Sequence, residues 1–365
     1  MSKSLNVLQI INYAAPYKGN FIPSIQFLGE NHIATDGTMV LLFAPHIKGS
    51  DAIGWIDELI EKKYKIYFMT GSIFHDTRLI HKICREYEIN IIHAHFMKMK
   101  MLIPVFLGKT RKCMQILHYH NHSEEYQDVI KKSIRRAIYK KMLMIACSES
   151  VYQSVVRDFP KNRSYVVNNG VDFHRLKQSE PLERCDTEVS KCLMFGFDYE
   201  RKGVDVAIEA IGLARKQLNV ELYIALSKNK EIVESKIVEA LGEIPNWLHL
   251  IKAQSDVATL YNSMDIFLSP SREEGLPYSV IEASYCRPIT IVSDIKAQRY
   301  LELPYNYTFE SEKPEKLASI ILEKAHMVEG KAQRKEMIRE DIEERYSLEK
   351  WANKISNVYK ECLYK

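Results

Sequence analysis

Short apolar segments rich in β-branched residues recur along the whole 365-residue chain, and stretches with helical periodicity separate them. One such stretch, 204–218, has apolar residues at helical spacing. Strands that are apolar on both faces and alternate with helices predict parallel sheets covered by helices on both sides. The segments predicted as strands are 5–11, 39–45, 65–71, 89–96, 114–120, 143–148, 164–170, 192–197, 221–227, 248–253, 265–271 and 288–294.

The length of the chain predicts two domains, because 365 residues exceed what a single hydrophobic core normally holds. A polar stretch without periodicity, 172–191, separates two halves of similar size. We therefore predict a first domain over 1–174 and a second domain over 175–345. Both are expected to be α/β, with a doubly wound parallel sheet, and to face each other across a cleft that binds the ligand.

Composition and charge exclude several classes of protein. The 51 basic and 47 acidic residues give a formal net charge of +4, too small to indicate a nucleic-acid partner. The seven cysteines show no C-x-x-C pair and no zinc-finger spacing, which favours a reducing cytoplasm. The N-terminal apolar run is short and interrupted, as in a strand rather than a signal peptide. No apolar run approaches the ~20 residues that span a bilayer, so we expect a soluble or peripheral protein.

One region of the chain is strongly basic. Between Lys98 and Lys141 lie eleven Lys and Arg (98, 100, 109, 111, 112, 131, 132, 135, 136, 140, 141) and three acids (124, 125, 128). Within it, "VIKKSIRRAIYKK" (129–141) spaces isoleucines at i, i+4 and i+8. The pattern fits a helix lying on anionic lipid at the inner face of a membrane. It fits equally a solvated helix that packs its isoleucines on the sheet.

Two carboxylates flank a predicted helix start in "SREEGLPYSVIEASYCRP" (271–288). Pro277 suits the first turn of a helix, which places Glu274 in the loop before the helix and Glu282 inside it. The preceding segment, "DIFLSPS", is predicted to be a buried strand. The carboxyl ends of parallel strands and the N-termini of helices are where α/β sheets bind anionic ligands. Both acids are therefore candidate ligand contacts.

A second loop combines cations with a helix start. In "FGFDYERKGVDVAIEA" (195–210), Arg201 and Lys202 precede Gly203 and a predicted helix from Val204. Two cations and helix amides at the end of a strand suit a diphosphate, although solvated surface charges would give the same pattern. In the loop after the first strand, Gly19 is a weaker candidate of the same kind. The Rossmann G-x-G-x-x-G and P-loop motifs are both absent from the sequence.

Histidines cluster at the ends of two predicted strands, in "IIHAHF" (His93, His95) and "ILHYHNHS" (His118, His120, His122). Alternate residues of a strand share a face. The histidines are therefore candidates for acid–base or hydroxyl-orienting roles, for a metal site, or for satisfied core positions.

Taken together, these stretches resemble retaining glycosyltransferases of the GT-B fold, of the family 4 type that uses nucleotide sugars. The resemblance covers nearly the whole chain in order, through the Gly19 loop, "IIHAHF", "ACSES", "VVNNGVD", "FGFDYERKGVD", "PSREEGLPYSVIEA" and the closing "YSLEKWANKI". It implies two Rossmann-like domains and a C-terminal helix, 346–365, that packs back on the first domain.

The resemblance also implies roles for individual residues. Glu274 would contact the hydroxyls of the donor sugar, Glu282 the ribose, and Lys202 the diphosphate, while His120 would lie beside the reacting centre. The residues expected to contact the nucleotide sugar are Gly19, Arg201, Lys202, Glu274, Gly275, Leu276 and Glu282. The residues expected to be catalytic are His120, Lys202 and Glu274.

Two positions depart from the family pattern. The family usually has Gly-Arg before the cationic loop, where this chain has Gly196-Phe197, so Arg201 is expected to supply the missing cation. The family also tends to have glycine before the proline at 288, where this chain has Cys286 and Arg287. The first departure leaves open a non-catalytic homologue that only binds the nucleotide sugar.

The implied activity is metal-independent transfer of a hexose from a UDP- or GDP-sugar to a hydroxyl of a lipid-linked, polysaccharide or other glycan acceptor. The leaving nucleoside diphosphate is an anion that has to be stabilised. Since the sequence has no Asp-x-Asp for a metal, cations and helix amides would do this. The alternatives are a nucleotide-sugar epimerase on the same fold, the non-catalytic homologue, and a metal hydrolase built on the H-x-H pairs.

Overall fold

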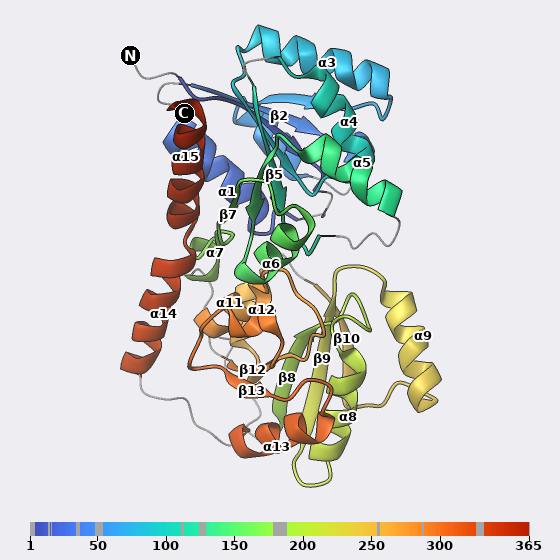
Figure 1. Ribbon diagram of the computed structural model, residues 1–365. Coiled ribbons are helices and arrows are strands. Elements are labelled where there is room, and N and C mark those ends of the chain that lie inside the picture. Colours follow the sequence, from blue (N-terminus) through green and yellow to red (C-terminus); the bar gives the residue numbers. More distant parts are fainter. Residues whose placement is uncertain are drawn as a thin grey trace. The chain divides into compact units, whose positions relative to one another are not determined.

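The computed structural model describes residues 4–13, 15, 17–33, 37–47, 54–110, 113–123, 129–177, 188–253, 256–286, 288–325 and 332–364 (Figure 1). The chain forms two compact units. Unit 1 comprises 1–171 and 346–365, and unit 2 comprises 172–345. The division thus lies at 171/172, close to the predicted boundary at 174/175. Val171 donates a backbone hydrogen bond to Tyr346, where the chain re-enters unit 1.

Unit 1 is built on a parallel sheet of seven described strands in the order β3-β2-β1-β4-β5-β6-β7. The strands are β1 (Asn6–Ile11), β2 (Thr38–Phe43), β3 (Lys65–Phe68), β4 (Ile91–His95), β5 (Met114–Tyr119), β6 (Leu143–Ala146) and β7 (Ser164–Val166). The strand order reverses between β1 and β4, which pair with Ile11 opposite His95. Such a switch point is where open α/β sheets bind ligands.

Helices cover the sheet of unit 1. They are α1 (Phe21–Leu28), a π-turn (Gly29–Ile33), a 3-10 turn (Pro45–Ile47), α2 (Trp55–Glu61), α3 (Ile73–Glu86), α4 (Met99–Gly108), α5 (Val129–Tyr139), α6 (Glu149–Asp158) and α15 (Leu348–Tyr364). The Ser72 and Ser148 hydroxyls cap α3 and α6 by accepting amide hydrogen bonds. The C-terminal α15 packs against α1 and places Trp351, Ile355 and Tyr359 in the core of this unit.

Unit 2 repeats the architecture with a parallel sheet of six described strands in the order β10-β9-β8-β11-β12-β13. The strands are β8 (Ser190–Phe195), β9 (Val220–Leu226), β10 (Leu248–Lys252), β11 (Ile266–Ser269), β12 (Ile289–Ser293) and β13 (Tyr307–Phe309). The strand order reverses between β8 and β11, so the loops after these two strands border the switch point of this sheet.

The helices of unit 2 are α7 (His174–Lys177), α8 (Val204–Ala214), α9 (Lys230–Leu241), α10 (Val257–Asn262), α11 (Tyr278–Tyr285), α12 (Lys296–Arg299), α13 (Pro314–Lys324) and α14 (Ala332–Tyr346). Asp256 caps α10 through the amide of Thr259. The core of the unit combines apolar side chains of α8 and α13 with those of the central strands. None of the helices in the described ranges is long and apolar enough to cross a bilayer.

Each segment predicted as a strand contains one in the structure. The three-residue strand β13 was not predicted. Of the two alternatives for 129–141, the one in which the isoleucines pack on the sheet fails at Ile134, whose side chain is 49% exposed. Arg135 is buried instead, where it pairs with Asp158 at 2.9 Å. Arg111, Lys112 and the three acids of the basic stretch lie outside the described residues, as does Arg287.

Candidate functional site

The loops after β8 and β11 meet at the switch point of unit 2. The amide of Arg272 donates to the carbonyl of Arg201 at 2.8 Å. Gly203 has φ +65°, and a Cβ at this position would come within 2.1 Å of the Pro270 carbonyl oxygen. Glycine is therefore required for the close approach of the two loops. This contact brings the start of α8 beside the loop that leads into α11.

Lys202 and Glu274 form the centre of the site, and both side chains are buried. Lys202 Nζ donates to Glu274 Oε1 at 2.6 Å, and Arg201 Nη1 donates to Glu274 Oε2 at 3.2 Å. The hydroxyl of Ser271 also donates to Glu274 Oε1, at 2.8 Å. Both carboxylate oxygens are thus held by donors, so the acid fixes the positions of the two cations. We name these four residues the Lys202 cluster.

The charge state of Glu274 follows from this environment. Burial by itself raises the pKa of a carboxyl group, but the attraction of Lys202 and Arg201 and the hydrogen bonds of the cluster outweigh it. The pKa of Glu274 therefore lies below its ordinary value, and the group is an anion at neutral pH. An ionised carboxylate accepts hydrogen bonds, which suits contact with sugar hydroxyls.

Phe197 stands where the family usually has arginine, and three cations lie near its ring. Arg201, Lys202 and Lys228 place their charged groups 5.3–5.4 Å from the ring centroid. Cations within about 6 Å of an aromatic face are attracted by its quadrupole. Lys228 follows β9, so the three cations come from the ends of two neighbouring strands. The positive charge at this edge of the sheet is therefore greater than Arg201 and Lys202 alone provide.

Glu282 lies on α11 and is paired within unit 2. One carboxylate oxygen binds the guanidinium of Arg175 from α7, and the other accepts from the hydroxyl of Tyr261 at 3.1 Å. The side chain is buried. Burial by itself lowers the pKa of Arg175. The attraction of Glu282 and neighbouring groups outweighs burial, so the pKa of Arg175 is raised. A ribose bound by Glu282 would therefore also meet Arg175 and Tyr261.

The remaining predicted residues of this loop are structural neighbours of the acids. Leu276 is buried, and its carbonyl accepts from the amide of Tyr278 at 2.9 Å in the turn that starts α11. Gly275 is half-buried between Glu274 and Leu276. Pro277 is the N-cap residue of α11, just before the first turn in which the sequence predicted it.

In unit 1, Gly19 lies in the turn before α1 and has φ +55°. A Cβ there would lie 2.8 Å from the hydroxyl oxygen of Tyr13, so the loop needs glycine at this position. The turn follows β1 at the switch point of the unit 1 sheet. This placement is compatible with close approach of a ligand to the backbone.

His120 follows β5 and is buried, with both ring nitrogens bonded inside unit 1. Its Nε2 lies 3.1 Å from His95 Nδ1, and its Nδ1 lies 3.2 Å from the side-chain amide nitrogen of Asn169. His95 Nε2 in turn lies 2.9 Å from the amide oxygen of Gln9. Since that oxygen only accepts, the proton of neutral His95 is on Nε2, and His95 Nδ1 accepts from His120. The chain of bonds therefore assigns the proton of His120 to Nε2.

Four histidines share one face of β4 and β5. His93 extends the chain, since its Nδ1 lies 2.6 Å from the hydroxyl of Tyr359, which accepts from Gln9 at 3.0 Å. His118 stacks between His93 and His120, with ring centroids 5.3 and 4.2 Å away. Burial lowers the pKa of His93 and of His120 to about 3. Burial also holds the pKa values of His95 and His118 well below the ordinary value, so these imidazoles are neutral at pH 7.

The same histidines are the metal-ligand candidates of the described residues. One ring nitrogen from each of His93, His95 and His118 lies within 4.8 Å of the others. His93 Nε2 and both nitrogens of His118 have no hydrogen-bond partner. Both nitrogens of His95, however, are already bonded, to Gln9 and His120. A metal bound here would have to break the chain that orients His120.

Several residues of the site were not predicted from the sequence. Lys228 carries a usable signal, because it directly follows a predicted strand. Arg175 and Tyr261 carry none, since their contact with Glu282 depends on how α7, α10 and α11 pack. The same holds for Gln9 and Tyr359, which are 350 residues apart.

Comparison with known proteins identifies the class. A family model described as "Glycosyltransferase Family 4" matches residues 31–175, and one described as "Glycosyl transferases group 1" matches residues 190–325. The first region covers β2 to β7 of the unit 1 sheet, and the second covers β8 to β13 of the unit 2 sheet. The chain belongs to the glycosyltransferases with the GT-B fold.

Individual relatives agree with this assignment. The capsular polysaccharide biosynthesis glycosyltransferase CapH of Staphylococcus aureus is 23% identical over 263 residues, which cover 66% of this chain and 69% of CapH. An N,N'-diacetylbacillosaminyl-diphospho-undecaprenol alpha-1,3-N-acetylgalactosaminyltransferase of Campylobacter jejuni is 31% identical over 93 residues, 26% of this chain and 23% of that protein. The match thus spans about a quarter of the second relative.

Solved structures share the fold over the full length. A glycosyltransferase from Rickettsia africae superimposes with a TM-score of 0.80 at 18% identity, covering 100% of both chains. HepE from Anabaena, solved in complex with UDP and glucose, superimposes with a TM-score of 0.74 at 14% identity, covering 98% of this chain and 100% of HepE.

Proposed function

We propose that the protein is a retaining, metal-independent glycosyltransferase that moves a hexose from a UDP- or GDP-sugar to a hydroxyl of a lipid-linked or polysaccharide acceptor. The observation that carries this proposal is the group of cations around Phe197 and Glu274 at the switch point of unit 2. A buried, oriented Lys202 with two further cations beside it at the start of a helix suits the diphosphate of a nucleotide sugar. The UDP bound by HepE supports a nucleotide-sugar donor.

The acceptor class rests on the relatives. CapH is a capsular polysaccharide enzyme, and the Campylobacter enzyme is named for a diphospho-undecaprenol acceptor. Both point to an acceptor in the assembly of a surface glycan, either lipid-linked or polymeric.

In the proposed reaction, the bond between the anomeric carbon and the diphosphate oxygen breaks while the acceptor oxygen bonds to the same face of that carbon. The acceptor proton passes to the departing phosphate oxygen. Lys202, Arg201 and Lys228 stabilise the negative charge that develops on the diphosphate. Glu274 accepts hydrogen bonds from the sugar hydroxyls and holds Lys202 in place. Glu282, with Tyr261 and Arg175, contacts the ribose.

For unit 1, we assign to His120 the orientation of a substrate hydroxyl, with the proton on Nε2. His95 and Asn169 now occupy its nitrogens, so a substrate would replace one of these contacts. Gly19 would allow the backbone after β1 to approach the substrate.

The test is sugar transfer by purified protein, with a panel of UDP- and GDP-sugars and nuclear magnetic resonance of the product anomer. Lys202→Met should lower kcat/KM about 10- to 100-fold, because a hydrogen bond to a charged group contributes about 1.5–3 kcal/mol. The matched control is Lys236→Met, which removes a half-exposed lysine paired with Glu200 at 2.5 Å in the same unit. Equal activity of Lys202→Met, Glu274→Gln and the parent would refute the site.

Product analysis separates the alternatives. A new sugar nucleotide formed without acceptor would indicate an epimerase. Donor binding in calorimetry without transfer or donor hydrolysis would indicate a non-catalytic homologue. An inverted anomer would contradict the retaining mechanism.

A further inference from the structure

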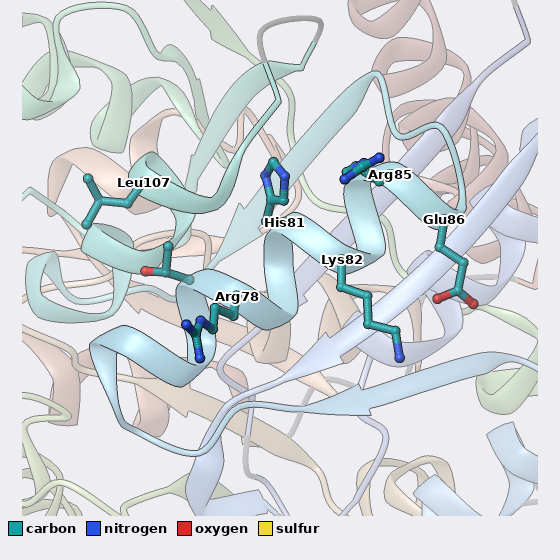
Figure 2. Close-up of a pocket in the computed structure, with 7 residues that line it drawn as sticks. Arg78, His81, Lys82, Arg85, Glu86 and Leu107 are labelled. Atoms are coloured by element: carbon teal, nitrogen blue, oxygen red, sulfur yellow. The ribbon is translucent and has the colours of Figure 1, made fainter.

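The outward face of α3 carries cations and an exposed aromatic ring. Ile80, Ile83 and Cys84 are buried against unit 1. Phe74, Arg78, His81, Lys82 and Arg85 are all exposed, and the spacing of three and four residues places them along one face of the helix. Figure 2 shows the side chains of this face from Arg78 to Arg85.

The neighbouring α4 adds apolar side chains to this surface. Gly108 lets the two helices come close, because a Cβ there would lie 2.6 Å from the Thr77 carbonyl oxygen and 2.9 Å from Ile80 Cβ. Leu107 thereby lines one side of an open groove of about 700 Å³ whose other side is α3 (Figure 2). The groove is lined by Thr77, Arg78, His81, Lys82, Arg85, Glu86 and Leu107.

Four of the twelve large hydrophobic side chains that are exposed in the described residues lie on these two helices. They are Ile73, Phe74, Phe106 and Leu107, and they are 41%, 60%, 38% and 56% exposed. A cation lies over each phenylalanine, with Arg78 4.1 Å from the Phe74 ring and Lys109 5.5 Å from the Phe106 ring. Aromatic rings combined with long cationic side chains are typical of surfaces that lie at the boundary between headgroups and acyl chains.

Cations outnumber acids on α3 and α4. Residues 73–86 and 98–109 contribute six cations, Arg78, Lys82, Arg85, Lys98, Lys100 and Lys109. They contribute two acids, of which Asp76 is buried and accepts from Thr70 and Gly71, leaving Glu86 at the surface. No described carboxylate lies within 4.0 Å of any of the six cations. The cations are thus available to an external anion.

We propose that the α3–α4 face is a docking surface for an anionic lipid bilayer. Lipid phosphates would bind Arg78, Lys82 and Arg85 along the groove, while Phe74 and Leu107 would enter the headgroup region. Charge complementarity favours a bilayer over a second copy of the chain, because two copies meeting through this face would bring like charges together. The assignment moves the predicted membrane contact, 98–141, to a surface that includes α3. It deepens the proposed function, since a lipid-linked acceptor lies at such a surface, but its test needs no turnover.

The experiment is co-sedimentation of the full chain with two kinds of vesicle, phosphatidylcholine alone and phosphatidylcholine with phosphatidylglycerol. Binding is expected only to the anionic vesicles, and it should weaken at high salt, because the Debye length falls from about 8 Å at physiological ionic strength to about 3 Å at 1 M. Each cation near an anionic surface contributes roughly fivefold to the partition coefficient. Arg78→Glu with Arg85→Glu should therefore reduce binding by at least ~25-fold. Phe74→Ser with Leu107→Ser should reduce it about tenfold.

The matched control is Lys140→Glu with Lys141→Glu, a double charge reversal at exposed positions of the same unit. It should reduce binding much less than the reversal on α3. Equal effects of the two reversals, or equal binding to both vesicle types, would overturn the assignment. The assignment would also be overturned by a dimer interface at this face. In that case the parent protein forms dimers in sedimentation velocity, and the α3 reversal dissociates them without changing vesicle binding. Unchanged circular dichroism melting excludes misfolding, and sugar transfer in detergent solution, measured separately, tests the proposed function alone.

Discussion

Acid should destabilise unit 1 through its four buried histidines. His93, His95, His118 and His120 are neutral in the folded protein because burial lowers their pKa values, to about 3 for His93 and His120. In the unfolded chain each regains a pKa near 6.5. Below about pH 6.5 the unfolded state therefore binds protons that the folded state does not, and stability falls as pH falls. The loss continues until the pH reaches the folded-state pKa values.

The size of the effect follows from proton linkage. For one such histidine, lowering the pH from about 7.5 to about 5.5 stabilises the unfolded state by roughly 1.4 kcal/mol. Four histidines give a loss of about 5 kcal/mol, against a total free energy of unfolding of about 5–15 kcal/mol for a typical protein. Unit 1 is therefore expected to lose much of its stability near about pH 5.5, well before most carboxylates are protonated.

Urea unfolding at several pH values between about 7.5 and 5.5, followed by circular dichroism, measures this loss. His118→Leu removes one titrating group of similar volume, and the loss should shrink to about 4 kcal/mol. His75→Gln, a substitution at an exposed position of the same unit, is the matched control. A parent protein that loses less than about 2 kcal/mol over this range would show that the cluster takes up protons while folded, and the reasoning would be refuted.

Three further results are expected. Gly203→Ala should lower the free energy of unfolding by about 2 kcal/mol or more and raise the KM for the donor, because φ is +65° and the added Cβ would clash with the Pro270 carbonyl. Unchanged values in urea unfolding and donor kinetics would contradict the close contact of the two loops. Arg135→Met should cost about 3–5 kcal/mol in urea unfolding, because it leaves the buried Asp158 without its main partner; a cost below about 1 kcal/mol would place the pair among ordinary surface contacts. Removal of metal with EDTA should leave sugar transfer unchanged, and a loss that zinc or manganese restores would contradict the metal-independent mechanism.

The sequence predicted those parts of the fold and site that depend on local pattern. Parallel sheets followed from apolar strands between amphipathic segments, and the starts of α8 and α11 followed from Gly203 and Pro277. Lys202 and Glu274 could be placed at strand ends because such loops lie at one edge of a parallel sheet. Their direct contact at 2.6 Å was not predicted, since it depends on the adjacency of β8 and β11 across the switch point.

Other features depend on side chains that only the folded chain brings together. The isoleucine spacing of 129–141 left two alternatives open, and the one with the isoleucines on the sheet fails at Ile134, because Arg135 takes the buried position and pairs with Asp158 on α6. The histidine face could be predicted from alternation along two strands, but the orientation of His120 depends on Asn169 and on Gln9. Long-range polar contacts of this kind leave no periodic signal in a sequence.

Phe197 stands where the family usually has arginine, and the ring explains how the site can stay positively charged without that arginine. The ring provides a face that attracts cations from its own loop and from the end of β9, so Lys228 joins Arg201 and Lys202 within 5.4 Å of one centroid. Three cations packed this closely repel one another, and two acids offset part of that repulsion. Glu274 bonds Arg201 and Lys202, and Asp198 accepts from Arg201 Nε at 3.1 Å. An incoming diphosphate would offset the rest. Glu274 and the ring of Phe197 therefore together fix the positions of the cations where an anion can bind. A pair of solvated surface charges would not need such contacts.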